Sequence, residues 1–187
     1  MNDSTKYLYR EILDRYVKIV WTHKIHLCQA SIHVKRQKQR NTLIAALSIL
    51  VSAAAITNIF KWLPEYVIVP LLAMLSLTLT FFTTRYKGDN LEKAASENEH
   101  FAAKMHHLRN CYAGLLSDVK AGLLSDEEIV AKRNVLENEE CLIYSSIVPA
   151  TSAKAVELAE EALKTRQEST TTNEEIRLMV PEYLQVD

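Results

Sequence analysis

Two long uncharged runs dominate the hydrophobic pattern of the chain, and they follow each other closely. No Asp, Glu, Lys or Arg occurs over residues 41–60, and none occurs over residues 66–84. As a helix, each run is about 30 Å long, which matches the hydrocarbon core of a bilayer. Because lipid offers the backbone no hydrogen-bond partner, the two runs predict two membrane-spanning helices.

The link between the runs is short, and the outer flanks are basic. Residues 61–65 join the runs and carry one charge of each sign, Lys61 and Glu65. A link of this length predicts an antiparallel hairpin over residues 42–84. The excess of basic residues at the other end of the hairpin predicts that both arms of the chain lie in the cytoplasm. We call these residues the basic collar: Lys35, Arg36, Lys38, Arg40, Arg85 and Lys87.

Aromatic residues stand at the ends of the runs. Trp62 and Tyr66 lie in or beside the link, and Tyr86 follows the second run. Such side chains concentrate where a membrane meets water, so we expect them at the two interfaces. The alternative is a hairpin buried in a soluble helical protein. It is disfavoured because core helices that are apolar all round rarely reach this length twice in succession.

The flanking segments have the period of amphipathic helices. Residues 1–41 predict one helix that continues into the first span, with Leu27 on its apolar side. Residues 85–166 predict three helices after a break near Gly88; the apolar stripe of the first includes Asn98. The second starts with a Ser125–Glu128 capping box. It carries Ile129, Leu136, Ile143 and Tyr144 inward, and Thr151 or Ser152 caps the third.

The expected fold is therefore all-α, a two-span transmembrane hairpin with a cytosolic helical bundle. Residues 1–41 form its N-terminal arm, and residues 167–187 form a polar linker and a short terminal helix. The basic and acidic residues are separated along the chain. Residues 1–41 hold nine Lys and Arg against three Asp and Glu, whereas residues 85–187 hold twelve against nineteen. We expect the basic arm to pack on the acidic helices, with a second role near anionic headgroups.

Composition excludes several classes of site. The three glycines, Gly88, Gly114 and Gly122, cannot form a phosphate-binding loop, a dinucleotide fingerprint or a nucleophile elbow. The chain predicts no cofactor, and direct binding of nucleic acid is disfavoured because the basic stretch abuts a bilayer. His23 with His26, and His107 with Cys111, have spacings that could hold a metal. No acidic residue recurs at a matching spacing to complete a metal site, so we interpret them as ordinary helix residues.

Two further groups admit a functional and a plain interpretation. Tyr16, Trp21 and Tyr112 could hold a nucleotide base, but we favour aromatic residues in the bundle core. The acidic clusters at residues 126–128, 137–140 and 160–161 are interpreted as helix caps and solvated faces.

Hydroxyl residues are the candidate functional residues of the spans. Ser48 and Ser52 share one stripe of the first span, and Ser76 and Thr80 share one stripe of the second. They either pack helices closely or line a weakly polar pore in an oligomer, since two helices enclose no channel. No ionisable residue occurs in either span, which disfavours a proton relay or a coupled transporter.

Three stretches resemble the SLATT family, two-transmembrane proteins found beside nucleotide-signalling and reverse-transcriptase genes in bacterial conflict systems. They are YREILDRYVKIVWTHKIHLCQA, CYAGLLSDVKAGLLSDEEIVAKRNVLENEE and PATSAKAVELAEEALK. The resemblance covers residues 5–166 and implies a homo-oligomeric, non-enzymatic effector of the bacterial inner membrane that makes the membrane leak when triggered. It implies a partner system that uses a nucleotide second messenger, a nucleotidyltransferase or a reverse transcriptase. The alternatives are a non-conducting membrane scaffold that recruits a partner protein and, least favoured, an enzyme.

Overall fold

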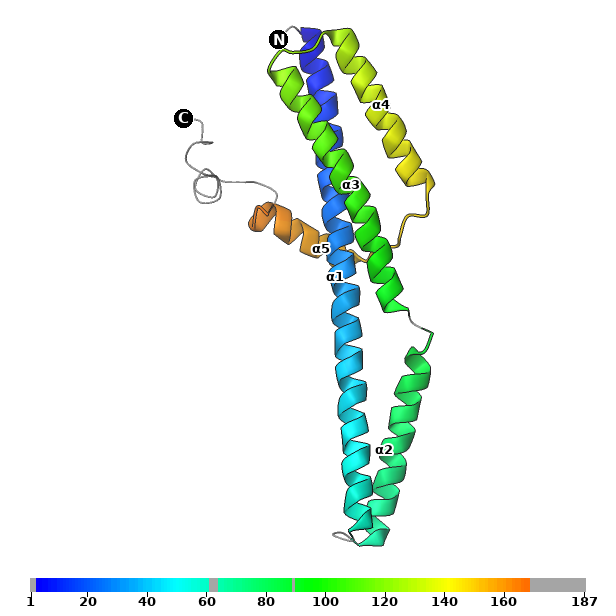
Figure 1. Cartoon of the computed structure of the whole chain (residues 1–187). Coiled ribbons are helices and arrows are strands. Elements are labelled where there is room, and N and C mark those ends of the chain that lie inside the picture. Colours follow the sequence, from blue (N-terminus) through cyan, green and yellow to red (C-terminus); the bar gives the residue numbers. More distant parts are fainter. Residues whose placement is uncertain (1–2, 61–63, 89, 169–187) are drawn as a thin grey trace, which may run out of the picture. The chain divides into compact units, whose positions relative to one another are not determined.

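Every regular element in the described part of the chain is a helix (Figure 1). The computed structural model describes residues 3–60, 64–88 and 90–168. Trp62 and Lys61 lie outside these residues, as do residues 169–187 with the predicted terminal helix. The all-α fold class is confirmed.

The helices begin and end close to the predicted positions. α1 spans Asp3–Ile59 and continues without interruption into the first uncharged run, and α2 spans Glu65–Tyr86. The others are α3 (Leu91–Lys120), α4 (Asp126–Ser145) and α5 (Ala153–Glu160), which leads into a π-helical turn at Glu161–Thr165. They form two compact units. The hairpin unit is Ala30–Ser96, and the bundle unit comprises Met1–Gln29 and Glu97–Asp187.

The hairpin unit buries few of the apolar side chains of its spans. Ile59, Met74 and Leu77 are each about two-thirds or more exposed, and only 6% of the most apolar 18-residue window of each span is buried. Water would penalise such a surface by about 25 cal/mol for each Å² of apolar area. The exposure contradicts the alternative of a hairpin buried in a soluble protein, and the length and apolar composition of the two helices fit a membrane-spanning pair.

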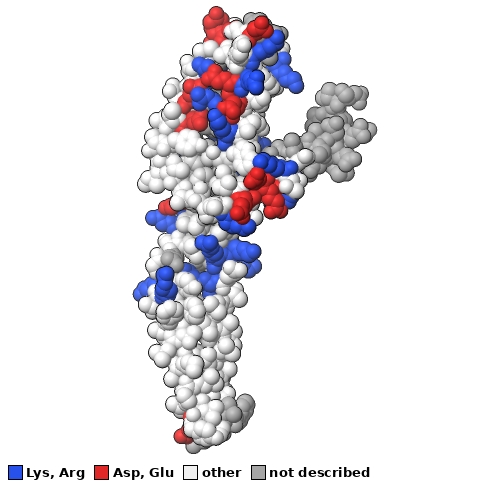
Figure 2. All heavy atoms as spheres, turned by 180° about the vertical axis from the view of Figure 1, so that it is seen from behind, with Lys and Arg blue, Asp and Glu red and all other residues white. Residues whose placement is uncertain are grey.

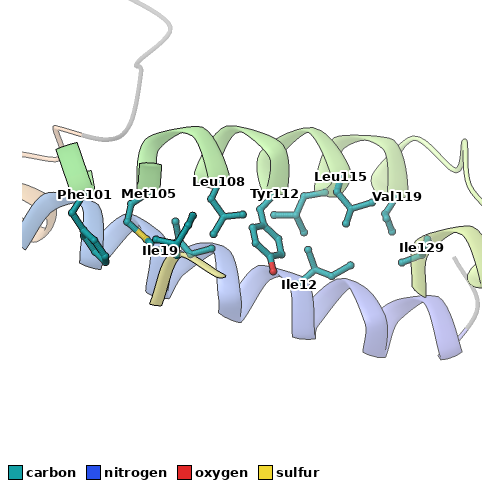
Figure 3. Packing of buried hydrophobic residues seen from close by; sticks show 11 residues of the cluster. Ile12, Ile19, Phe101, Met105, Leu108, Tyr112, Leu115, Val119 and Ile129 are labelled. Carbon is teal, nitrogen blue, oxygen red and sulfur yellow. The ribbon is translucent and has the colours of Figure 1, made fainter. Parts of the chain in front are cut away.

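The bundle unit has the hydrophobic core that the hairpin unit lacks. Side chains from α1, α3 and α4 meet in one cluster (Figure 3). Apolar residues recur along α3 every three or four positions, so one face of that helix supplies most of the cluster. Its members are Ile12, Ile19, Phe101, Met105, Leu108, Tyr112, Leu115, Leu116, Val119, Ile129 and Ile143.

Local signals in the sequence set the helix ends in the bundle unit. The Ser125 hydroxyl accepts from the Glu128 amide at 3.3 Å, and the Ser125 amide donates to the Glu128 carboxylate at 2.8 Å. This pair completes the predicted capping box. Gly122 has a φ of +70° just after α3, a conformation that glycine adopts without steric cost. Ser152, not Thr151, caps α5 by accepting from the Ala155 amide at 3.3 Å.

Two residues predicted to face inward are more than one-third exposed, and in each case a polar contact explains the exposure. Leu27 is 38% exposed because its neighbour His26 takes the buried position and is hydrogen-bonded there. Tyr144 is 42% exposed because its hydroxyl donates to the Thr22 hydroxyl at 3.4 Å and stays near the surface. Its ring still packs edge-to-face on Phe101, with 6.0 Å between the ring centroids.

Replacing Leu108 by alanine tests whether this core holds the bundle unit together. Leu108 is fully buried, so Leu108→Ala should destabilise the protein by about 2–5 kcal/mol. Val135 on α4 is 65% exposed, and Val135→Ala is the matched control, expected within about 0.5 kcal/mol of wild type. Thermal unfolding of the detergent-purified protein measures both, and equal effects would contradict the assigned core.

Candidate functional site

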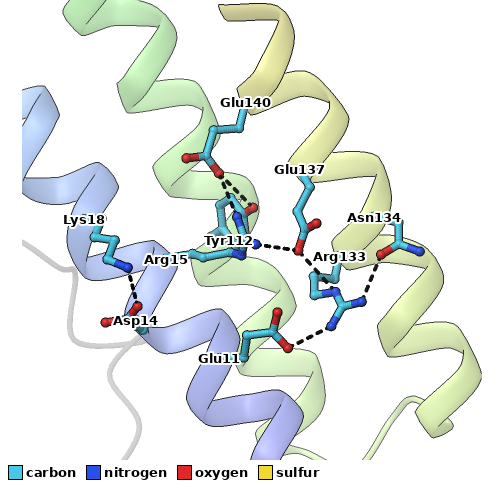
Figure 4. Close-up of polar contacts among 9 residues, drawn as sticks. All are labelled: Glu11, Asp14, Arg15, Lys18, Tyr112, Arg133, Asn134, Glu137 and Glu140. Carbon is cyan, nitrogen blue, oxygen red and sulfur yellow. Dashed lines mark hydrogen bonds and ion pairs between the residues drawn. The ribbon is translucent and has the colours of Figure 1, made fainter. Parts of the chain in front are cut away.

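A network of charged side chains joins α1 to α4 in the bundle unit (Figure 4). Arg15 on α1 lies 3.1 Å from the Glu137 carboxylate and 3.5 Å from the Glu140 carboxylate. Arg133 on α4 reaches back to Glu11 at 2.8 Å and contacts Glu137 at 3.3 Å. The predicted packing of the basic N-terminal arm on an acidic helix is confirmed.

The network corrects the interpretation of one acidic cluster. Glu137 and Glu140 are only 28% and 20% exposed at their side chains, so they do not form a solvated face. Charges at this depth interact more strongly than exposed pairs, because less water screens them. The second pairing of the basic arm lies further along α1, where Lys24 contacts Glu168.

The aromatic residues do not form a base-binding pocket. Tyr112 is fully buried in the core, where its hydroxyl lies 3.5 Å from a Glu140 carboxylate oxygen. Burial and then the neighbouring Glu140 charge raise the pKa of Tyr112, so it stays a neutral hydrogen-bond donor. Tyr16 packs against the same cluster. Trp21 instead lies beneath Lys164, whose Nζ is 5.7 Å from the ring centroid. The plain interpretation as core and packing residues holds.

Two buried polar contacts were not predicted. His26 Nδ1 lies 2.8 Å from the Asn98 side-chain oxygen, which ties α1 to α3. The Gln29 side-chain oxygen accepts from the Ser152 amide at 2.9 Å and from its hydroxyl at 2.8 Å, which ties α1 to the start of α5. A polar residue on an apolar stripe, such as Asn98, indicates a buried polar contact, but the sequence does not identify the residue at the other end of that contact.

A second histidine lies beside this contact in a positively charged setting. The ring centroids of His23 and His106 are 5.3 Å apart. Burial, followed by the charges of His106, Arg109 and Lys24, lowers the pKa of His23 from 6.5 to about 4. No group of three or more possible metal ligands gathers within residues 3–60, 64–88 and 90–168.

The pKa of His23 predicts that acid destabilises the bundle unit. Between about pH 6.5 and 4 the unfolded chain binds a proton at position 23 that the folded chain does not, so stability falls as the pH falls. His23→Gln should flatten the dependence of the unfolding temperature on pH in this window. His107→Gln removes a histidine that is 69% exposed and should leave the slope unchanged. Identical slopes for wild type and His23→Gln would rule out this assignment.

The hydroxyl groups of the spans bond to their own helices. The Ser48 hydroxyl donates to the Ile44 carbonyl at 2.8 Å, and that of Ser52 donates to the Ser48 carbonyl at 2.9 Å. On α2, the Thr80 hydroxyl donates to the Ser76 carbonyl at 2.8 Å. Each bond satisfies the hydroxyl proton in lipid and leaves oxygen lone pairs that can accept from water or a neighbouring helix.

The basic collar lies at the end of the hairpin unit away from the link. Figure 2 shows Lys and Arg gathered there, next to a surface without charged side chains over the spans. Arg40 is half-buried and donates to the Tyr86 carbonyl at 3.1 Å, with its guanidinium carbon 5.6 Å from the Tyr86 ring centroid. Tyr66, at the opposite end of α2, is 82% exposed. The other members of the collar are exposed: Lys35, Arg36, Lys38, Arg85 and Lys87.

A shallow apolar surface also follows α4 in the bundle unit. Val135, Leu142 and Ile147 are 65%, 71% and 94% exposed. Leu142 also lines a pocket of about 520 Å³ between α3 and α4, whose polar lining residues include His100, Lys104 and Glu139. Exposed apolar groups beside polar ones are typical of surfaces that contact another protein.

Comparison with known proteins identifies a family. The family model described as SMODS and SLOG-associating 2TM effector domain family 4 matches residues 8–175. It therefore covers both spans and every described helix apart from the first five residues of α1. No curated protein and no solved structure matches the chain.

Proposed function

Because this chain belongs to the SMODS and SLOG-associating 2TM effector family, we propose that it is an oligomeric effector of a bacterial antiphage system. When triggered, it permeabilises the inner membrane and stops growth of the infected cell. The observation that carries this proposal is the hairpin unit, whose two long apolar helices expose their side chains around stripes of hydroxyl residues.

The proposed pore needs several copies of the chain. Two helices cannot enclose a channel, so neighbouring hairpins must contribute the remaining wall. Small residues at positions 48 and 52 let helices approach closely, and hydroxyl oxygens at 76 and 80 can accept from water. The spans carry no ionisable residue, which favours a passive leak over coupled transport.

The proposed orientation puts both termini in the cytoplasm. The basic collar supplies the positive charge that favours retention on the cytoplasmic side. The bundle unit would then face the cytosol, where a signal from a nucleotide-signalling or reverse-transcriptase system could reach it. The family description names association with SMODS and SLOG, which supports such a partner system. We expect no direct contact with nucleic acid.

A scaffold is the second candidate function. The exposed apolar residues Val135, Leu142 and Ile147 on and after α4 favour it, because such a surface can recruit another protein. A scaffold would act without conduction. The two functions therefore differ in whether the membrane loses its potential.

Membrane depolarisation separates the two candidates. Cells would express the full chain, first alone and then with its trigger system, in the presence of a potential-sensitive dye. The effector predicts loss of potential once the protein is activated. An unchanged potential in growth-arrested cells that contain the inserted protein would exclude the effector and leave the scaffold.

Bulky side chains on the α2 hydroxyl stripe test the proposed pore wall. Ser76→Leu with Thr80→Leu should abolish toxicity without lowering the amount of inserted protein, because leucine fills the wall and removes its oxygen acceptors. Thr78 lies about 200° around the helix from Ser76, and Thr78→Leu is the control expected to retain toxicity. Undiminished killing by the double variant would remove both residues from the pore wall.

A further inference from the structure

One pocket of the hairpin unit lies where the basic collar meets the first span. Its volume is about 330 Å³, within the range of about 300–1,000 Å³ that small-molecule sites occupy. Both of its arginines come from α1, one helical turn apart, and its aromatic wall comes from the last residue of α2. The lining residues are Arg36, Gln39, Arg40, Leu43, Tyr86 and Leu91.

The chemistry of the lining is that of an anion site with an apolar edge. Guanidinium groups bind phosphate oxygens through several parallel N–H donors, and the Gln39 amide adds neutral donors. Arg40 is held in place by the Tyr86 carbonyl at 3.1 Å and by the face of its ring. Like charges four residues apart on a helix repel each other, so an anion between Arg36 and Arg40 would be favoured.

The surrounding sequence adds to the positive field. No Asp or Glu occurs from residue 15 to residue 64, a segment that contains the whole α1 contribution to the pocket. Leu43 belongs to the uncharged run that begins at residue 41, so the pocket lies within one turn of the lipid-facing span. A ligand with a phosphate head and apolar chains would satisfy both parts of this surface.

We propose that Arg36, Gln39 and Arg40 bind the phosphate of an anionic phospholipid headgroup beside the Tyr86 ring, with the acyl chains of that lipid along the exposed spans. Basic pockets beside transmembrane helices commonly bind such headgroups. A free phosphate compound shares the headgroup chemistry, but it would leave Leu43 and the neighbouring apolar surface without a partner. The proposal depends on the hairpin in the membrane and stands independently of whether the protein conducts.

Native mass spectrometry of the delipidated, detergent-purified full chain tests the proposal. Phosphatidylglycerol and phosphatidylcholine with identical acyl chains would be titrated separately. Both headgroups present a phosphate, but the basic collar repels the choline cation of phosphatidylcholine, so we expect phosphatidylglycerol to bind about tenfold more tightly. Glycerol 3-phosphate and ATP serve as free phosphate probes and should bind at least about tenfold more weakly than the lipid.

Neighbouring residues provide a matched pair of variants. Arg36→Gln removes a charge that lines the pocket and should weaken phosphatidylglycerol binding about tenfold. Lys35→Gln removes an equal charge next to it, outside the lining, and should change binding less than about twofold. Gln39→Leu keeps the charge of the collar and removes one amide donor, for an expected loss of about fivefold. Both Arg36 and Gln39 are exposed, and thermal unfolding checks that the variants are folded.

Three results would overturn the proposal. Equal losses for Arg36→Gln and Lys35→Gln would show that the collar attracts anions only through its overall charge. Equal affinity for the two lipids would show that the headgroup charge is not recognised. Binding of ATP or glycerol 3-phosphate as tight as that of the lipid would assign the pocket to a free phosphate compound.

Discussion

The absence of water from the hydrocarbon core of a membrane is the constraint on which the structure depends. A backbone amide or a charge in that region has no solvent partner, so α1 and α2 satisfy their own amides and carry no charge over residues 41–60 and 66–84. The same constraint explains why the hydroxyls of Ser48, Ser52 and Thr80 bond to carbonyls one turn back. It also places the basic collar and Tyr86 just beyond the uncharged segments, where charge meets water again.

Different forces hold the bundle unit together. One face of α3 buries a continuous apolar stripe against α1 and α4, and the Arg15 and Arg133 pairs fix which face of α4 meets α1. The buried His26–Asn98 and Gln29–Ser152 contacts fix how α1 is aligned along α3 and α5. A shift of one residue along α1 would leave a buried polar group without its partner. The hairpin unit exposes apolar surface, as a segment in contact with lipid requires, and the bundle unit buries its apolar side chains, as a segment in contact with water requires.

The sequence predicted features that depend on neighbours in the chain and missed those that depend on distant partners. The two uncharged runs, the Ser125–Glu128 capping box and the break near Gly88 each depend on residues close together in the chain, and all were predicted. The burial of His26 in place of Leu27 depends on Asn98, which is 72 residues away along the chain. Glu137 looked like a solvated residue because its partner Arg15 lies on another helix. The proposed pore-lining role of the hydroxyl stripes depends on neighbouring copies of the chain and not on residues of one chain.

Membrane orientation is the most direct test of the account. In an otherwise cysteine-free chain, Glu65→Cys would place a thiol at the start of α2, and a companion chain would keep only the exposed native Cys141 on α4. Both would be treated in intact cells with a maleimide that cannot cross the inner membrane. The account predicts labelling at position 65 in intact cells and at Cys141 only after permeabilisation. Equal labelling of the two thiols in intact cells, or the reverse pattern, would contradict a hairpin that crosses the membrane with its bundle inside.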